Sequence, residues 1–358
     1  MSDNNQLRKN EPRRDGALTR EWGRRELLQT GGLLALGRGG VAAAETGIPN
    51  QKPSMKYRPL GRTGMTVSEI GLGAHYHYGG PGTKGRDCKS VEARREVVAK
   101  ALEAGINFYD NCIQPERETL GAVLPPHRER FYLMTDVNAL RGKNKATAAD
   151  LGREFLENTK VLRTEYVDLF RFNNNNTPDE VTFELTELAY RVFQNFKKES
   201  RARHFAVSGH DPDQMLKCIN RYDFIEAFYM PFNYVTQGAT KDLLPAAKRK
   251  GVGVIVIKPF MMGTMFALPE DDPALKGLRE QRESLAVANL RFILSNDAVS
   301  TVIPGMRRAE EIDVNLKALQ RRGVTQAELR ALDRVAACVR EHPRPGYEWL
   351  TQKWHVSA

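Results

Sequence analysis

Strand and helix patterns alternate along most of the chain, and this alternation limits the fold more than any other feature. Short apolar runs rich in Val, Ile and Phe are each followed by apolar residues at helical spacing. The expected strands span 106–110, 131–136, 166–172, 202–208, 224–230, 252–258 and 299–304, after a first one through 67–70 that precedes Gly71-Leu72-Gly73. Eight such units with short connections predict an α/β fold, a parallel (β/α)8 barrel of the TIM type.

Glycine and proline residues mark the ends of the expected helices. Gly105 and Gly251 are typical of helix C-caps, and Pro178 is expected to open a long helix over 179–199. Later helices are expected over 284–295, 308–320 and 325–339, followed by an irregular tail. The predicted organisation is a leader over 1–45, a linker over 46–54, a barrel over 55–340 and a carboxyl-terminal tail over 341–358.

The charge and the cysteines exclude several classes of function. The net charge of +10 is spread along the chain without a basic run interleaved with aromatic residues, so nucleic acid is not an expected partner. The four cysteines include no Cys-x-x-Cys pair, so neither a zinc knuckle nor an iron–sulfur cluster is indicated. A disulfide framework is not expected at this density of cysteines.

The amino-terminal 45 residues resemble a twin-arginine signal peptide. Residues 1–22 are polar, and Arg24-Arg25 then precedes the weakly apolar segment TGGLLALGRGGVAAA, which ends at small residues. This segment is too short and too rich in glycine for a stable membrane span. We expect export through the twin-arginine machinery to the periplasm or another extracytoplasmic compartment; the alternative is a basic tail without a targeting role.

Several short motifs together resemble the aldo/keto reductase family over about residues 55–320. They are MKYRPLGRTGMTVSEIGLG at 55–73, GINFYDNCIQPERETLG at 105–121, YVDLF at 166–170, Val207-Ser208, Pro231-Phe232-Asn233, Lys258-Pro259-Phe260 with Gly263, and Val302-Ile303-Pro304-Gly305 followed by Asn315. The resemblance implies a hairpin within 55–73 that plugs the barrel bottom. It also implies carbonyl reduction with NADPH, for which the family uses a tyrosine, a lysine, an aspartate and a histidine.

Only one of those four catalytic positions keeps its residue. Asp110 matches the aspartate, at the carboxyl end of a strand where β/α barrels place their chemistry. The tyrosine position falls at Gln114-Pro115, the lysine position is Asp136 and the histidine position is Asn173. A carboxylate in place of the lysine raises the pKa of a neighbouring acid. The family's proton-donor chemistry therefore does not carry over.

Other residues at the strand ends offer replacement acid or base groups. Lys258 is expected to be a cation for Asp110 or Asp136, a ligand for a cofactor phosphate, or a partner in a rim salt bridge. His210 is a candidate acid or base because imidazole titrates near neutral pH; the alternative is a helix cap. Tyr76 and Tyr78 could supply a phenol from another loop. The candidate catalytic set is Asp110, His210, Lys258 and Asn173.

The resemblance also implies a dinucleotide site for NADP or NAD. The candidate cofactor-binding residues are Gly73, Ser208, Tyr229, Pro259, Phe260, Gly263, Pro304, Gly305, Arg307 and Asn315. Tyr229 stands where the family has a glutamine that holds the carboxamide. Glu311 stands in place of an arginine and opposes a phosphate, although Arg307 or Arg308 could compensate through a bidentate contact.

Three functions remain open from the sequence. The leading hypothesis is an NAD(P)H-dependent oxidoreductase that acts on a small carbonyl or sugar-like substrate with a remodelled acid/base site. The second is a catalytically inactive barrel that binds a ligand or a partner. The third is a metal-dependent enzyme on the same rim, because histidine and carboxylate side chains suit zinc, manganese or iron. Its expected ligands are His75, His77, Asp110, Asp136 and His210.

Overall fold

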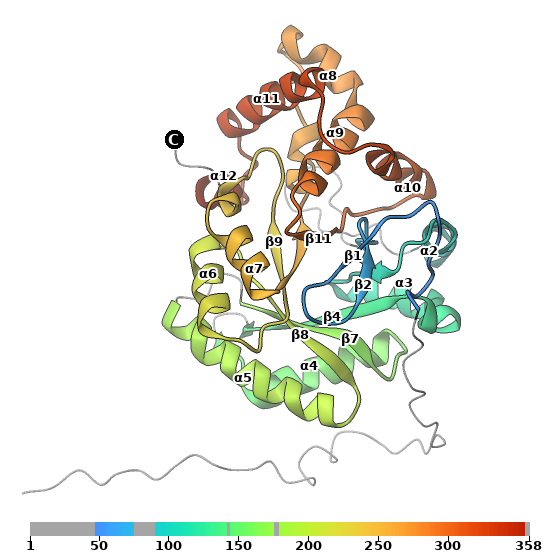
Figure 1. Ribbon diagram of the computed structural model, residues 1–358, viewed down its shortest axis with the longest axis vertical. Coiled ribbons are helices and arrows are strands. Elements are labelled where there is room, and N and C mark those ends of the chain that lie inside the picture. The colour runs from blue at the N-terminus through green and yellow to red at the C-terminus, as the bar shows by residue number, and fades with distance from the viewer. Residues whose placement is uncertain (1–46, 75–89, 142–143, 175–178, 355–358) are drawn as a thin grey trace, which may run out of the picture. The chain divides into compact units, whose positions relative to one another are not determined.

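A parallel sheet that closes on itself forms the centre of the protein (Figure 1). The computed structural model describes residues 47–74, 90–141, 144–174 and 179–354; the expected signal peptide and residues 75–78 lie outside them. The strand order is β11-β10-β9-β8-β7-β4-β3. Their bounds are β3 (Phe108–Tyr109), β4 (Tyr132–Asn138), β7 (Val167–Asn173), β8 (Ala202–Ser208), β9 (Ala227–Pro231), β10 (Gly253–Ile257) and β11 (Val299–Val302).

Residues 70–73 close the barrel between the two edges of this sheet. Ile70 pairs in parallel with Val302 of β11, and Leu72 pairs with Tyr109 of β3. The N–H of Leu72 donates to the carbonyl of Phe108 at 2.8 Å. The predicted (β/α)8 barrel is therefore confirmed, although its first strand is a set of single bridges.

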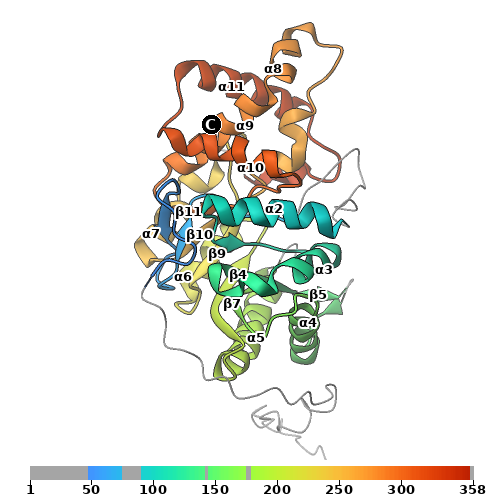
Figure 2. The same cartoon turned by 90° about the vertical axis from the view of Figure 1, so that its right-hand side faces the viewer.

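In the described part of the chain, one helix follows each of the eight barrel positions. The helices are α2 (Val91–Ala104), α3 (Gln114–Val123), α4 (Ala148–Val161), α5 (Asp179–Lys198), α6 (Pro212–Arg221), α7 (Leu243–Lys250), α9 (Arg282–Ser295) and α10 (Ala309–Leu316). Figure 2 shows α2, α3, α4 and α5 in succession on the outside of the strands. Gly105 and Gly251 end α2 and α7 in the left-handed conformation, as predicted. No described helix is long and apolar enough to cross a membrane.

The strands alternate between an outer face and a lumen face. On the outer face, aromatic side chains such as Phe170, Phe205 and Phe228 pack against the helices in the main core. On the lumen face, Met134, Leu169, Ala206, Tyr229 and Ile255 form a separate cluster. This two-residue period means that the polar side chains at the lumen-facing ends of neighbouring strands converge on one mouth.

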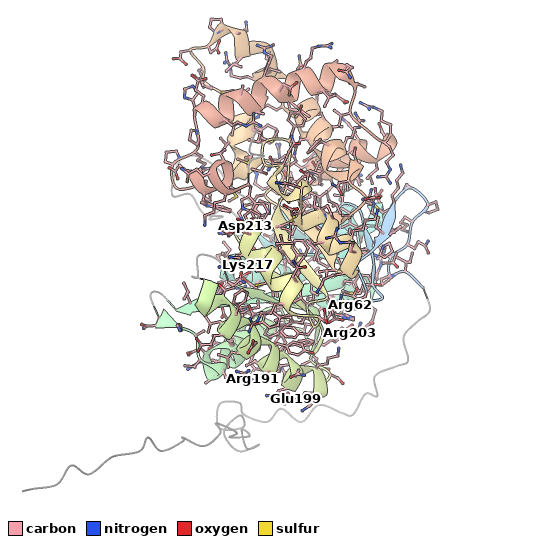
Figure 3. All side chains as sticks on the ribbon, turned by 60° about the vertical axis from the view of Figure 1, so that its left-hand side comes forward. Arg62, Arg191, Glu199, Arg203, Asp213 and Lys217 are labelled. Carbon is pink, nitrogen blue, oxygen red and sulfur yellow. The ribbon has the colours of Figure 1, made fainter. Side chains whose placement is uncertain are left out.

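A short hairpin fills the other end of the lumen, as the resemblance implied. Strands β1 (Tyr57–Pro59) and β2 (Thr66–Ser68) pair antiparallel. Leu60, Met65 and Val67 of this hairpin belong to the lumen cluster. Arg62 in the turn, labelled in Figure 3, donates to the carbonyl oxygens of Lys250 and Ile225, each at 2.7 Å. The hairpin is therefore tied to the segments that enter β9 and β10.

Both ends of the described chain pack more closely than the sequence suggested. Asn50, in the expected linker, donates to the carbonyl of Leu102 at 2.9 Å. Helix α11 (Gln326–Glu341) confirms the helix expected over 325–339, whereas α12 (Glu348–Lys353) lies in the expected irregular tail. Leu350 and Trp354 are fully buried, and the Trp354 indole donates to the carbonyl of His210 at 2.9 Å. Apolar residues in the tail explain the difference, because burial favours an ordered helix.

The remaining elements are short. They are β5 (Leu140–Arg141) and β6 (Asn144–Lys145), α8 (Lys276–Glu280), and the 3-10 helices η1 (Pro125–Arg130), η2 (Gly238–Thr240), η3 (Met261–Phe266), η4 (Pro273–Leu275) and η5 (Lys317–Gln320). The helix expected over 308–320 divides into α10 and η5.

Gly61→Ala should destabilise the barrel more than Gly64→Ala. Both glycines have positive φ angles, so each substitution costs about 1–2 kcal/mol of backbone strain. A Cβ at Gly61 would also lie 2.2 Å from the N of Gly253, whereas a Cβ at Gly64 meets no atom within 4 Å. We expect Gly61→Ala to cost a further ~1–3 kcal/mol of unfolding free energy in urea denaturation. Equal losses of unfolding free energy in the two variants would contradict a close contact between Gly61 and β10.

Candidate active site

Polar side chains from five neighbouring strands meet at the carboxyl ends of the barrel. Asp136 of β4 lies in register with Arg171 of β7, and Asn173 of β7 lies in register with Ser208 of β8. Asp110 directly follows β3, and Tyr229 of β9 is in register with Ser208. The structure therefore brings together the predicted residues Asp110, Asn173, Ser208 and Tyr229 with Asp136, and adds Arg171.

Arg171 is the centre of this cluster. Its Nη1 lies 3.1 Å from Oδ1 of Asp110, and its Nη2 lies 3.1 Å from Oδ2 of Asp136. The three side chains are only 4%, 5% and 1% exposed, respectively. Burial alone would lower the pKa of Arg171, but the carboxylates of Asp136 and Asp110 reverse this effect and raise it. The guanidinium is therefore a permanent cation between two buried carboxylates.

A second arginine completes the pairing of Asp136. Arg117 of α3 contacts Oδ1 of Asp136 through Nη2, and Asn173 donates its amide N–H to Oδ2. Arg117 also donates to the carbonyl of Cys112 at 2.8 Å and to Oδ1 of Asn111 at 3.0 Å. The loop after β3 is thus held against β4, and two guanidinium groups match two carboxylates.

Sequence reasoning missed both arginines. Arg117 falls within the motif at 105–121 and Arg171 within the strand expected over 166–172, and neither is among the candidate residues. One signal was present in the sequence, because Arg171 is a charged residue in the expected strand, two positions before Asn173. With a two-residue period, that spacing places Arg171 on the same face as Asn173.

Lys258 and His210 form a second group beside this cluster. The Nζ of Lys258 lies 3.4 Å from Nε2 of His210, and the His210 ring stacks on Trp349 of α12 with centroids 4.0 Å apart. Burial, followed by the charge of Lys258, lowers the pKa of His210 to about 2. This environment favours a neutral His210 over the predicted acid/base role near neutral pH. His210 stays neutral and accepts a hydrogen bond from Lys258.

Lys258 itself has unusual electrostatics. Burial, with a smaller contribution from the charge of Arg171, lowers the pKa of its ammonium group to about 8. Among the described residues, no carboxylate forms an ion pair with Lys258. Its backbone is also strained, with a φ of +53° directly before Pro259. These features are typical of a functional residue.

Neither of the positions that the resemblance gives to tyrosine and glutamine offers a good proton donor. Pro115 lies in the first turn of α3, and the nearby Cys112 has a pKa raised to about 12 by burial and by Asp136. Tyr229 lies beneath Arg171, with the guanidinium carbon 4.6 Å from its ring centre. Burial and Asp110 raise the pKa of Tyr229, and its hydroxyl has no partner among the described residues. Neither group gives up a proton readily at neutral pH.

A cleft of about 1210 Å³ opens above these residues. Asp110, Arg171, Asn173 and Lys258 line it together with most of the predicted cofactor-binding residues: Gly73, Ser208, Pro259, Phe260, Gly263, Gly305, Arg307 and Asn315. Tyr229 and Pro304 lie outside its lining. The cleft is larger than a typical small-ligand pocket of about 300–1,000 Å³, so its volume is sufficient for a ligand as large as a dinucleotide.

The backbone around the cleft also fits a large ligand. A Cβ at Gly73 would lie 2.5 Å from the carbonyl O of Pro304, so only glycine fits where the first barrel position meets the loop after β11. Lys258, Met261, Met262 and Gly263 all have positive φ angles, which turn this loop sharply along the cleft wall. Strained loops of this kind cluster at ligand sites.

The described residues do not provide the expected metal site. No group of three or more histidine, cysteine or acidic side chains suited to a metal ion occurs among them. Asp110 and Asp136 contact arginine, and His210 faces Lys258. The other two expected ligands, His75 and His77, and the alternative phenols Tyr76 and Tyr78 lie outside the described residues.

Comparisons with known proteins agree with this architecture. A family model described as "Aldo/keto reductase family" matches residues 69–337. The chain is 24% identical over 345 residues to "L-glyceraldehyde 3-phosphate reductase" of Escherichia coli (strain K12), with 81% of this chain and 94% of that protein covered. It is 25% identical over 291 residues to "L-galactose dehydrogenase" of Arabidopsis thaliana, with 74% and 88% covered.

A solved structure shares the fold. The holo form of "aldo-keto reductase AKR11C1 from Bacillus halodurans" superposes with a TM-score of 0.61 at 23% sequence identity, covering 78% of this chain and 96% of that one.

Arg171→Met should strongly destabilise the protein. The substitution leaves Asp110 without its guanidinium and removes one of two from Asp136, and breaking a buried pair in this way costs about 3–5 kcal/mol. The matched control is Arg203→Met, because Arg203 (Figure 3) is half-exposed and its partner Asp168 keeps Arg128 at 2.7 Å. We expect the control to lose about 1 kcal/mol or less in urea denaturation. Similar losses for the two variants would contradict the central role of Arg171.

Proposed function

The chain belongs to the aldo/keto reductase family and is an NAD(P)-dependent oxidoreductase, and we propose that it reduces a small carbonyl or sugar-like substrate with a rebuilt proton-donating site. The observation that carries this proposal is the single cleft that joins the Asp110–Arg171 cluster to most of the predicted cofactor residues. The names of two relatives, a glyceraldehyde-phosphate reductase and a galactose dehydrogenase, support a small sugar-like substrate.

The cleft residues hold the cofactor in this proposal. Gly73, packed against Pro304, and Gly305 line the cleft, Ser208 and Asn315 offer polar side chains, and the loop from Pro259 to Gly263 forms one wall. The bound dinucleotide supplies the hydride for reduction. The protein must then supply a proton and must stabilise the negative charge that develops on the carbonyl oxygen.

Lys258 is the proposed proton donor. The positions that the family fills with tyrosine, lysine and histidine hold Pro115, Asp136 and Asn173, so the usual donor is replaced. Of the described groups at the reacting end of the cleft, the ammonium of Lys258 has a pKa of about 8, which suits proton transfer near neutral pH. The neutral ring of His210 accepts from its Nζ and so positions it.

Arg171 and Asn173 complete the proposed roles. The fixed charge of Arg171 lies in the lining of the cleft, where it stabilises a developing alkoxide. Asp110 and Asp136 position the guanidinium from two sides. Asn173 donates its amide hydrogens to Asp136 and Asn138 and lines the cleft where the family has the histidine that orients the carbonyl. Its remaining polar atom, Oδ1, can accept from a substrate hydroxyl.

A second candidate function has one observation in its favour. Both strand-end carboxylates already contact arginine, so the cluster is stable without a reaction to perform. A barrel that binds a dinucleotide or another ligand without turnover fits that observation. The two candidates differ in whether bound cofactor is consumed.

Lys258→Met should remove activity and its dependence on pH. With the wild type, loss of NADH or NADPH absorbance against a panel of small aldehydes, ketones and sugars should show kcat falling as the pH rises through about 8, because the protonated form donates. Lys258→Met should lower kcat by about 10²–10⁴-fold. Lys258→Arg keeps the charge but cannot release a proton, so it should not restore kcat.

The control for this prediction is Cys112→Ser, which alters another titratable group of the same cleft. It should keep the fall in kcat near pH 8. If Lys258→Met kept wild-type kcat with the same pH profile, Lys258 would not be the donor. Cofactor binding without turnover in the wild type would favour the ligand-binding alternative.

We further propose that residues 1–45 direct the folded protein out of the cytoplasm through the twin-arginine machinery. The adjacent Arg24-Arg25, the weakly apolar segment after them and the small residues Ala42-Ala43-Ala44 support this proposal. The family resemblance is consistent with it, because this route carries folded proteins and suits a barrel with a bound cofactor.

Replacing both Arg24 and Arg25 by lysine should keep the full chain in the cytoplasm. The chain offers a matched control, since Arg13-Arg14 is another adjacent pair in the polar region before the expected signal. Fractionation of cells that express each variant should show the control in the extracytoplasmic fraction and the Arg24/Arg25 variant in the cytoplasm. Equal export of both variants, or retention of the wild type, would disprove the targeting role.

A further inference from the structure

The wall of the cleft opposite Arg171 is built by α10 and the start of α9. Helix α10 follows β11, and β11 is separated from β7 by three strands in either direction around the closed barrel. The lining residues of this wall include Glu280, Arg282, Glu283, Arg307, Arg308, Glu310, Glu311 and Asn315. A dinucleotide whose reacting end faces Arg171 and Lys258 must place its adenosine half against this opposite wall.

The side chain of Glu311, a residue in the first turn of α10, caps the amino-terminal end of that helix. Its Oε2 accepts from the backbone N–H of Arg307 at 2.6 Å and of Arg308 at 3.3 Å. Its Oε1 lies 3.6 Å from Nε of Arg308. Free N–H groups and the helix dipole normally make such a helix end attractive to a phosphate. Here a carboxylate of the chain itself already uses those groups.

The same wall has no surplus positive charge. Four carboxylates, from Glu280, Glu283, Glu310 and Glu311, stand among four guanidinium groups of the cleft lining, from Arg282, Arg307, Arg308 and Arg344. Arg308 is already engaged by Glu311. A phosphate monoester would add about −1.5 to −2 charges near neutral pH to a lining whose positive and negative charges are already equal in number. A ribose diol brings no charge and can donate to a carboxylate.

We propose that Glu311 makes the cleft selective for NADH over NADPH, by repelling the 2′-phosphate and by accepting from a ribose hydroxyl. Carboxylates beside the adenosine ribose perform this selection in other dinucleotide sites. The inference rests on the proposed function in one respect, namely that the cleft holds a dinucleotide. The proposal specifies NADH as the cofactor in place of the more general NAD(P)H.

Titration of the purified full chain with NADH and with NADPH tests the proposal. Binding is followed by calorimetry or by nicotinamide fluorescence, so that no substrate or turnover is needed. The variant is Glu311→Gln, whose side-chain oxygen can still accept from the amides of α10 and so preserves the helix cap. The matched control is Asp313→Asn, which removes a carboxylate from the same helix at an exposed position paired with Lys100.

The wild type should bind NADH at least tenfold more tightly than NADPH. Glu311→Gln should reduce that ratio severalfold, mainly by tightening NADPH, while Asp313→Asn should keep the wild-type ratio. Wild-type affinity for NADPH equal to or above that for NADH would overturn the proposal, as would an unchanged ratio in Glu311→Gln. Binding of neither nucleotide would instead disprove the proposed function, and the selectivity with it.

Discussion

The need to neutralise charge inside the barrel mouth controls the arrangement of this site. Asp110 and Asp136 lie almost fully buried at the ends of adjacent strands, and two carboxylates in such a position repel each other and lose their solvation. Arg171 reaches both of them, and Arg117 adds a second cation from α3. The loop after β3, strand β4 and strand β7 are therefore fixed relative to one another by a single set of contacts.

The same contacts explain why the barrel mouth can hold residues that differ from the family pattern. In the family pattern the cation beside the strand-end aspartate comes from the position of Asp136, whereas here it comes from Arg171 on the next strand. A carboxylate at position 136 without Arg171 would leave two buried anions side by side. The changes at positions 136, 171 and 173 are thus physically linked, because Asn173 also donates to Asp136. Substituting one of them back toward the family pattern would disturb the others.

The sequence predicted the fold well because alternating apolar runs carry that information locally. Strand β8 matches its expected bounds, and Gly105 and Gly251 end helices as expected. The site was predicted only in position: Asp110, Asn173, Ser208 and Lys258 do line one cleft. Their states could not be predicted, because they depend on residues far away in the chain. The neutral His210 is an example, since Trp349 stacks on it from α12.

Residues 344–354 pack against the site from a part of the chain far from the strands that form it. Trp354 binds the backbone of His210, Trp349 covers its ring, and Arg344 contacts the carbonyl of Met262 in the loop after β10. The burial that lowers the pKa values of His210 and Lys258 therefore depends on α12 and the residues next to it, which lie far along the chain from both strand ends.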